Sequence, residues 1–127
     1  MENEKLNIKQ YEQNGLGNLY YGLISFIGRY VEQNYNPTEI FKGGYSYYAM
    51  AVIEMKKSLK ELLNYLLAAN EVFLPSLNRN VKLKNLNTKE QIALEDRCKE
   101  YILLNLNKTM EQYAEKLNCN NNGKSRK

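Results

Sequence analysis

The feature that most constrains this chain is an apolar repeat between Ser46 and Phe73. Because its steps alternate between four and three residues, the repeat lies along one face of an α-helix, and the residues between are mostly polar helix formers. It predicts one unbroken helix over residues 46–73, with Ser46 as N-cap and Pro75 just after its end. The repeat consists of Tyr48, Val52, Met55, Leu59, Leu62, Leu66, Ala69 and Phe73.

Two other stretches have helical periodicity. Residues 16–34 carry apolar side chains on one side, and residues 88–117 carry a longer stripe that follows two overlapping capping boxes over residues 87–91. A short helix is expected to begin at Asn36-Pro37, with Pro37 in its first turn, and to stop at Gly43-Gly44. The expected stripe of the last helix is Leu94, Cys98, Ile102, Leu106, Met110, Tyr113 and Leu117.

These elements predict an all-α fold, an antiparallel helical bundle of three long helices plus a short connector helix. Its arrangement is four-helix-like. The middle of the last helix is apolar on nearly every side, which favours self-association as a homo-oligomer. At 127 residues we expect one domain over residues 1–118, with an N-terminal arm over 1–15 and a basic loop over 74–87. Residues 119–127 are expected to form a disordered basic tail.

Composition restricts the chemistry more than any motif does. The chain has no histidine, which excludes Ser-His-Asp and Cys-His catalysis as well as HExxH metal hydrolysis. Its two cysteines, Cys98 and Cys119, lack the spacing of a metal site or a disulfide framework. We therefore expect no catalytic residues, no metal and no cofactor. The first ten residues lack the apolar core of a signal peptide and no long apolar run follows, so we expect a cytoplasmic protein without a membrane partner.

Basic and aromatic residues are the candidates for partner or nucleic-acid binding, because the net charge is +4. The same residues also have a purely structural interpretation. Lysine stems can cover apolar surface, the basic loop can be a connector that packs on the ends of the helices, and tyrosines can form the rim of a core. The candidates are Lys56 and Lys60 in the central helix, Arg79, Lys82 and Lys84 in the basic loop, Tyr45 and Tyr47 in a tyrosine-rich region, and Lys124 and Arg126 in the tail.

The sequence favours a small non-enzymatic protein that docks on a larger protein or ribonucleoprotein. One example of this class is a phage or mobile-element regulator that inhibits a nucleic-acid-guided system. The alternative is a helical bundle that binds RNA or DNA directly through the basic loop and the tyrosine-rich region. The two differ in their response to salt, because phosphate contacts weaken steeply as salt rises.

Overall fold

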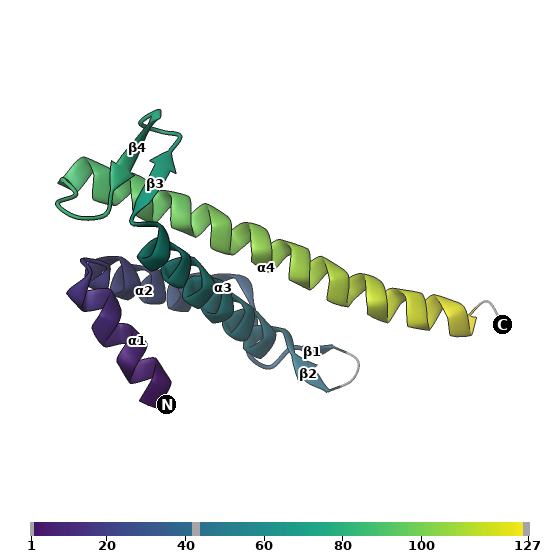
Figure 1. Cartoon of the computed structure of the whole chain (residues 1–127). Coiled ribbons are helices and arrows are strands. Elements are labelled where there is room, and N and C mark those ends of the chain that lie inside the picture. The colour runs from purple at the N-terminus through teal and green to yellow at the C-terminus, as the bar shows by residue number, and fades with distance from the viewer. Residues whose placement is uncertain (1, 42–43, 126–127) are drawn as a thin grey trace.

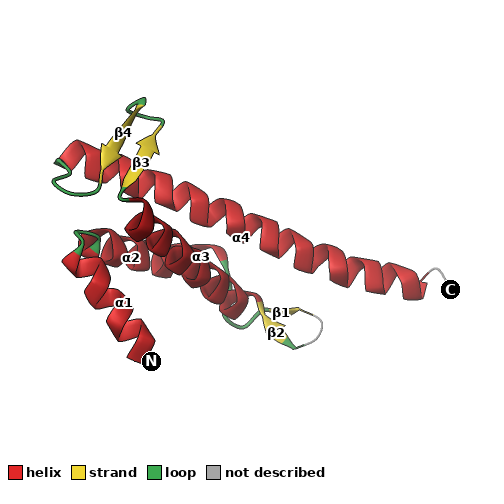
Figure 2. Cartoon of the chain, viewed as in Figure 1, coloured by secondary structure: helices red, strands yellow, loops and turns green. Residues whose placement is uncertain are grey.

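The computed structural model describes the backbone of residues 2–41 and 44–125 and the side chains of residues 8–40, 44 and 46–112. It is mostly helical, as the sequence predicted, but it also holds two small antiparallel sheets that were not predicted (Figure 1, Figure 2). The described elements are α1 (Glu2–Gln13), α2 (Gly17–Asn34), β1 (Ile40–Phe41), β2 (Tyr45–Ser46), α3 (Tyr47–Ala69), β3 (Glu71–Leu74), β4 (Arg79–Lys82) and α4 (Thr88–Ser125).

The core lies around α3, which packs against both α2 and α4, while α2 also contacts α4. α3 and α4 run in opposite directions (Figure 1). Met55, Leu59 and Leu66 of the predicted repeat are buried, and so are Ala51 and Leu63 beside it, so the contact face of α3 is wider than one seam. Burial of a Leu or Met side chain is worth roughly 1.5–3 kcal/mol, which makes this the main source of stability. The partner helices contribute Leu19, Leu23, Ile27 and Val31 from α2, and Leu94, Cys98, Ile102 and Leu106 from α4.

The prediction of an unbroken helix over residues 46–73 is wrong at its C-terminal end. Its start is confirmed, because the Ser46 hydroxyl accepts a hydrogen bond from the Ala49 N–H at 3.3 Å. α3 ends at Ala69, however, and Asn70 adopts the left-handed conformation with φ 61°, donating its N–H to the Leu66 carbonyl. Asparagine tolerates this conformation better than most residues, and it is a common way for a helix to stop.

The expected basic loop over residues 74–87 is a β-hairpin for about half its length. β3 pairs with β4 in antiparallel register, Val72 opposite Val81 and Leu74 opposite Arg79. The connection over Pro75–Asn78 closes with a hydrogen bond from the Leu77 N–H to the Leu74 carbonyl at 3.0 Å. The hairpin forms because Leu74 and Val81 alternate with exposed residues and bury one face of the ladder on the helices.

The expected short helix after Asn36 is also absent from the described residues. The Asn36 carboxamide oxygen instead accepts from the N–H and the hydroxyl of Thr38 at 2.9 and 2.8 Å, which forms a turn. This local bonding competes with the helical pattern. β1 then pairs with β2, with Ile40 opposite Ser46.

The N-terminal arm is a helix in the structure. α1 packs on α2, and its buried Tyr11 donates a hydrogen bond from its hydroxyl to the Asn64 side chain of α3 at 2.9 Å. The buried ring of Tyr11, with its hydroxyl satisfied, therefore helps to dock α1 on the core.

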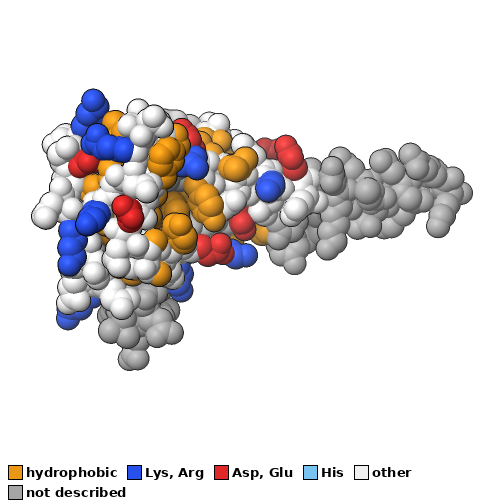
Figure 3. Space-filling model, turned by 45° about the horizontal axis from the view of Figure 1, so that its top comes forward, with side chains coloured by type: hydrophobic (Ala, Val, Ile, Leu, Met, Phe, Trp, Pro, Cys, Tyr) orange, Lys and Arg blue, Asp and Glu red, His pale blue; other side chains and the backbone are white. Residues whose placement is uncertain are grey.

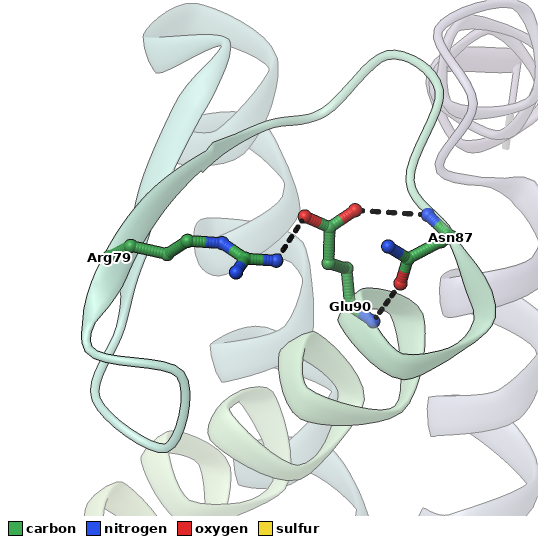
Figure 4. A network of polar contacts seen from close by, with 3 residues as sticks. All are labelled: Arg79, Asn87 and Glu90. Atoms are coloured by element: carbon green, nitrogen blue, oxygen red, sulfur yellow. Dashed lines mark hydrogen bonds and ion pairs between the residues drawn. The ribbon is translucent and has the colours of Figure 1, made fainter.

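The start of α4 confirms the predicted capping box. The Asn87 side chain accepts from the Glu90 N–H at 2.8 Å, and the Glu90 carboxylate accepts from the Asn87 N–H at 3.0 Å (Figure 4). Its far end differs from the expectation, because the α4 backbone continues as helix to Ser125, beyond Leu117 and into the tail predicted to be disordered. The side chains of residues 113–125 lie outside the described part of the chain.

Candidate binding surfaces

A largely apolar groove of about 470 Å³ lies between the second half of α3, strand β3 and the first half of α4. We call it the aromatic groove. It is lined by Glu61, Leu62, Tyr65 and Leu66 of α3, by Val72 and Phe73 of β3, and by Leu94, Arg97, Cys98 and Tyr101 of α4.

Three aromatic side chains from three different elements form its rim. Tyr65 is 61% exposed, Phe73 49% and Tyr101 37%, although each ring carries a large apolar area. Single exposed apolar residues are common, but apolar residues gathered on one concave surface are typical of interaction sites. Figure 3 shows hydrophobic side chains gathered between the hairpin end of the molecule and α4.

The floor of the aromatic groove is part of the core. Leu66, Leu94 and Cys98 are buried beneath the rim. Burial raises the pKa of the Cys98 thiol to about 12, with the nearby Glu95 carboxylate adding to the effect. Because the thiolate is the reactive form, Cys98 acts as a packing residue in this groove and not as a nucleophile.

Two opposite charges flank the aromatic groove. Glu61 lies on the α3 side and Arg97 on the α4 side, where the Arg97 guanidinium is 3.5 Å from the Glu100 carboxylate in an exposed ion pair. Such exposed pairs are worth little energy. Apart from Glu61 and Arg97, the lining residues of the groove are apolar or aromatic.

The hairpin divides the basic residues predicted for the loop. Arg79 is held by Glu90, whose carboxylate lies 2.9 Å from the guanidinium and also caps α4 (Figure 4). The Asn87 N–H and then Arg79 lower the pKa of Glu90, because both stabilise its ionised form. Lys82 lies opposite Glu71 in the ladder. Lys84, the third predicted basic residue of the loop, lies just after the end of β4. Lys82 and Lys84 do line one concavity together, with Glu71 among its other residues.

Lys56 and Lys60 lie in a different place from the hairpin lysines. Both are exposed on α3 and line a smaller pocket of about 160 Å³, together with Tyr11 of α1 and Tyr20 of α2. The structure thus brings Lys56 and Lys60 together as predicted, but places them in a separate pocket from Lys82 and Lys84.

Of the remaining predicted site residues, Tyr47 alone has a described side chain. Tyr47 is half-buried at the first position of α3. Tyr45 belongs to β2 and Lys124 to α4, but their side chains lie outside the described residues, as does Arg126 entirely.

Comparison of the chain with protein-family models, curated proteins and solved structures gives no match. In the part of the chain that the structure describes, no helix has the length and apolarity needed to cross a bilayer. Nor do three or more His, Cys, Asp or Glu side chains cluster there as metal ligands. The function must be argued from the surfaces alone.

The sequence interpretation missed the aromatic groove because it placed Phe73 on a helix. The sequence carries one signal: Val81 and Leu83 alternate with polar residues after a turn-rich segment, and a short apolar run, residues 72–74, precedes that segment. Two short runs of this kind around a turn-rich segment are compatible with a hairpin.

Proposed function

We propose that this chain is a non-enzymatic binding protein that docks on a larger protein, and that apolar side chains of the larger protein fill the aromatic groove. The observation that carries the proposal is the convergence of Tyr65, Phe73 and Tyr101 around one concavity of about 470 Å³. Aromatic residues at the centre of an interface contribute most of its binding energy, because they bury a large area and lose little conformational freedom.

The distribution of charge favours protein over nucleic acid as the partner. Arg79 is neutralised by Glu90, and Glu71 faces Lys82 across the hairpin. Phosphate backbones are bound by several cations along one surface. The four predicted lysines with described side chains line two separate pockets, Lys56 and Lys60 in one and Lys82 and Lys84 in the other, and the aromatic groove is more apolar than either.

The chemistry of the groove is consistent with a role other than catalysis. Glu61 and Arg97 are its charged lining residues and stand at its rim, where solvent reaches them, and the chain has no histidine. A general base or nucleophile is usually activated by burial or by a close partner. Cys98 is buried, but its raised pKa keeps it protonated.

The self-associating, four-helix-like bundle expected from the sequence stays a prediction. In that case a second copy of the chain would cover the aromatic groove. The net charge of +4 opposes self-association, so we assign the groove to a different protein. The suggestion that this protein is a phage or mobile-element regulator that inhibits a nucleic-acid-guided system also remains a prediction.

Capture experiments with matched variants test the proposal. Wild-type chain, the double variant Tyr65→Ser/Tyr101→Ser and the control Tyr21→Ser are immobilised, and a host lysate is passed over each after nuclease treatment in moderate salt. Tyr21 is a suitable control because it is 51% exposed and lies on α2, away from the groove.

The expected result is one protein retained by wild type and by Tyr21→Ser, with at least a tenfold loss on the double variant. Equal retention by the three immobilised chains would contradict docking through the groove. A parallel run with untreated lysate tests the alternative: retention seen there but lost after nuclease treatment would favour nucleic-acid binding.

A further inference from the structure

The outer edge of β3 has unpaired backbone groups. The Leu83 N–H donates to the Asn70 carbonyl at 3.1 Å, and these two residues are the next opposed pair before Glu71 and Lys82. In an antiparallel ladder, hydrogen-bonded pairs alternate with pairs whose N–H and C=O groups point outward. The outward groups of β3 therefore belong to Glu71 and Phe73.

These groups have no protein partner among the described residues. Among the described residues, no backbone or side-chain group outside the ladder forms a hydrogen bond with the N–H or carbonyl of Glu71 or Phe73. Both residues are exposed. The β3 edge thus presents two donors and two acceptors in an alternating row, which is a template for another strand.

The free edge adjoins the aromatic groove. Val72 and Phe73 line that groove together with Tyr101 and Arg97 of α4. Any chain that hydrogen-bonds to Glu71 and Phe73 lies over the groove, and its side chains alternate between the groove and solvent. One site can therefore supply both main-chain hydrogen bonds and an apolar pocket.

The opposite edge of the hairpin differs. By the same register, the outward residues of β4 are Asn80 and Lys82, which carry polar and charged side chains. Each edge carries one charged residue, Glu71 or Lys82, which discourages pairing at that position. The β3 edge, however, has the exposed ring of Phe73 where the β4 edge has Asn80, and it adjoins the aromatic groove. The asymmetry between the two edges directs strand addition to β3.

We propose that the segment of the larger protein that enters the aromatic groove is an extended strand that pairs with β3, with apolar side chains at alternate positions. This inference rests on the proposed function and adds the conformation of the bound segment. A helix does not fit the edge, because its own N–H and C=O groups are already paired internally. Extended peptides bind free sheet edges in this way, with main-chain bonds giving affinity and pockets giving specificity.

A phage-displayed library of random twelve-residue peptides, selected on the full-length chain, supplies the probe. Enriched peptides are synthesised and their affinities measured for wild type, Phe73→Ala and Phe73→Pro. Phe73→Ala removes the ring but keeps the outward N–H. Phe73→Pro removes both, while the ladder bonds to β4 stay intact because that N–H points away from β4.

We expect peptides with apolar residues at alternate positions. Phe73→Ala should weaken their binding several-fold, and Phe73→Pro should weaken it roughly tenfold further, as expected for a lost main-chain bond. In wild type, bound peptide should slow hydrogen exchange at the Glu71 and Phe73 amides. The Val72 amide is the internal control, because it already donates to β4 and reports that the hairpin is folded.

Equal affinity for the two Phe73 variants, unchanged exchange at the Glu71 amide, or no enriched peptide would each overturn strand addition. Protection of both amides in the chain alone, together with sedimentation as a dimer, would assign the edge to a second copy and overturn a partner strand. The proposed function is tested separately, because it requires that the double variant Tyr65→Ser/Tyr101→Ser lose capture of the partner from lysate.

Discussion

Asn70 offers a direct test of where α3 ends and the hairpin begins. If α3 ends at Ala69, Asn70→Gly should be more stable than Asn70→Ala; if the helix continued to residue 73, Asn70→Ala should be more stable than Asn70→Gly. Its backbone is left-handed, with φ 61° and ψ −3°, and its side chain is exposed without a recorded hydrogen bond. Asn70→Ala and Asn70→Gly therefore change the backbone preference with little change in packing.

The magnitude follows from the conformation. A left-handed alanine costs roughly 1–2 kcal/mol, whereas glycine adopts this region without that cost. Glycine also loses more conformational entropy on folding than alanine does, which offsets part of this difference. The net expectation is that Asn70→Gly is about 1 kcal/mol more stable than Asn70→Ala. If residues 46–73 were one helix, the order would reverse, because glycine costs about 1 kcal/mol relative to alanine inside a helix.

Urea denaturation followed by circular dichroism measures the difference. With a slope of roughly 2 kcal/mol per molar, the glycine variant should unfold at about 0.5 M higher urea than the alanine variant. Wild type should lie near the glycine variant, because asparagine is tolerated in the left-handed region. An alanine variant that is as stable as the glycine variant, or more so, would refute the assigned end of α3.

Three further predictions concern the core, the α4 cap and the buried thiol. Leu63→Ala should destabilise the fold by about 2–5 kcal/mol in urea titrations, because Leu63 is fully buried, whereas Ile53→Ala, at an exposed position, should cost under about 0.5 kcal/mol. The folded state lowers the pKa of Glu90, so its contribution to stability is complete above the unfolded pKa of about 4.3 and is lost as pH falls through the folded pKa. The stability difference between wild type and Glu90→Gln should therefore shrink between pH 6 and pH 3, and a pH-independent difference would contradict this. In a Cys119→Ser background, Cys98 should resist a thiol reagent at pH 8 until denaturant is added, because burial raises its pKa to about 12; fast labelling of the folded chain would show that the thiol is accessible.

The helical part of the fold was predictable because its signals are local and repeated. The α3 repeat through Met55, Leu59 and Leu66 and the α4 stripe from Leu94 to Leu106 both face the core as their spacing requires. The caps at Ser46 and Asn87 were readable for the same reason, since each depends on residues three positions apart.

The hairpin and the aromatic groove were not predicted because they depend on contacts between segments. Phe73 continues the four-and-three spacing of α3, so periodicity alone places it on the helix. What decides the structure is the left-handed conformation of Asn70 at the end of α3 and the pairing of β3 with residues 79–82. Likewise, the sequence predicted Arg79 as a binding residue, because its ion pair with Glu90 forms only when the hairpin packs beside α4.

All the residues that line the aromatic groove fall within one uninterrupted stretch of the chain, from Glu61 to Tyr101. None of the described residues of α1 and α2, which precede that stretch, lines the groove, although α2 packs against both α3 and α4. Substitutions in α1 and α2 can therefore alter the protein's abundance and thermal tolerance while leaving recognition unchanged. Recognition itself can diverge through a few changes in this single stretch.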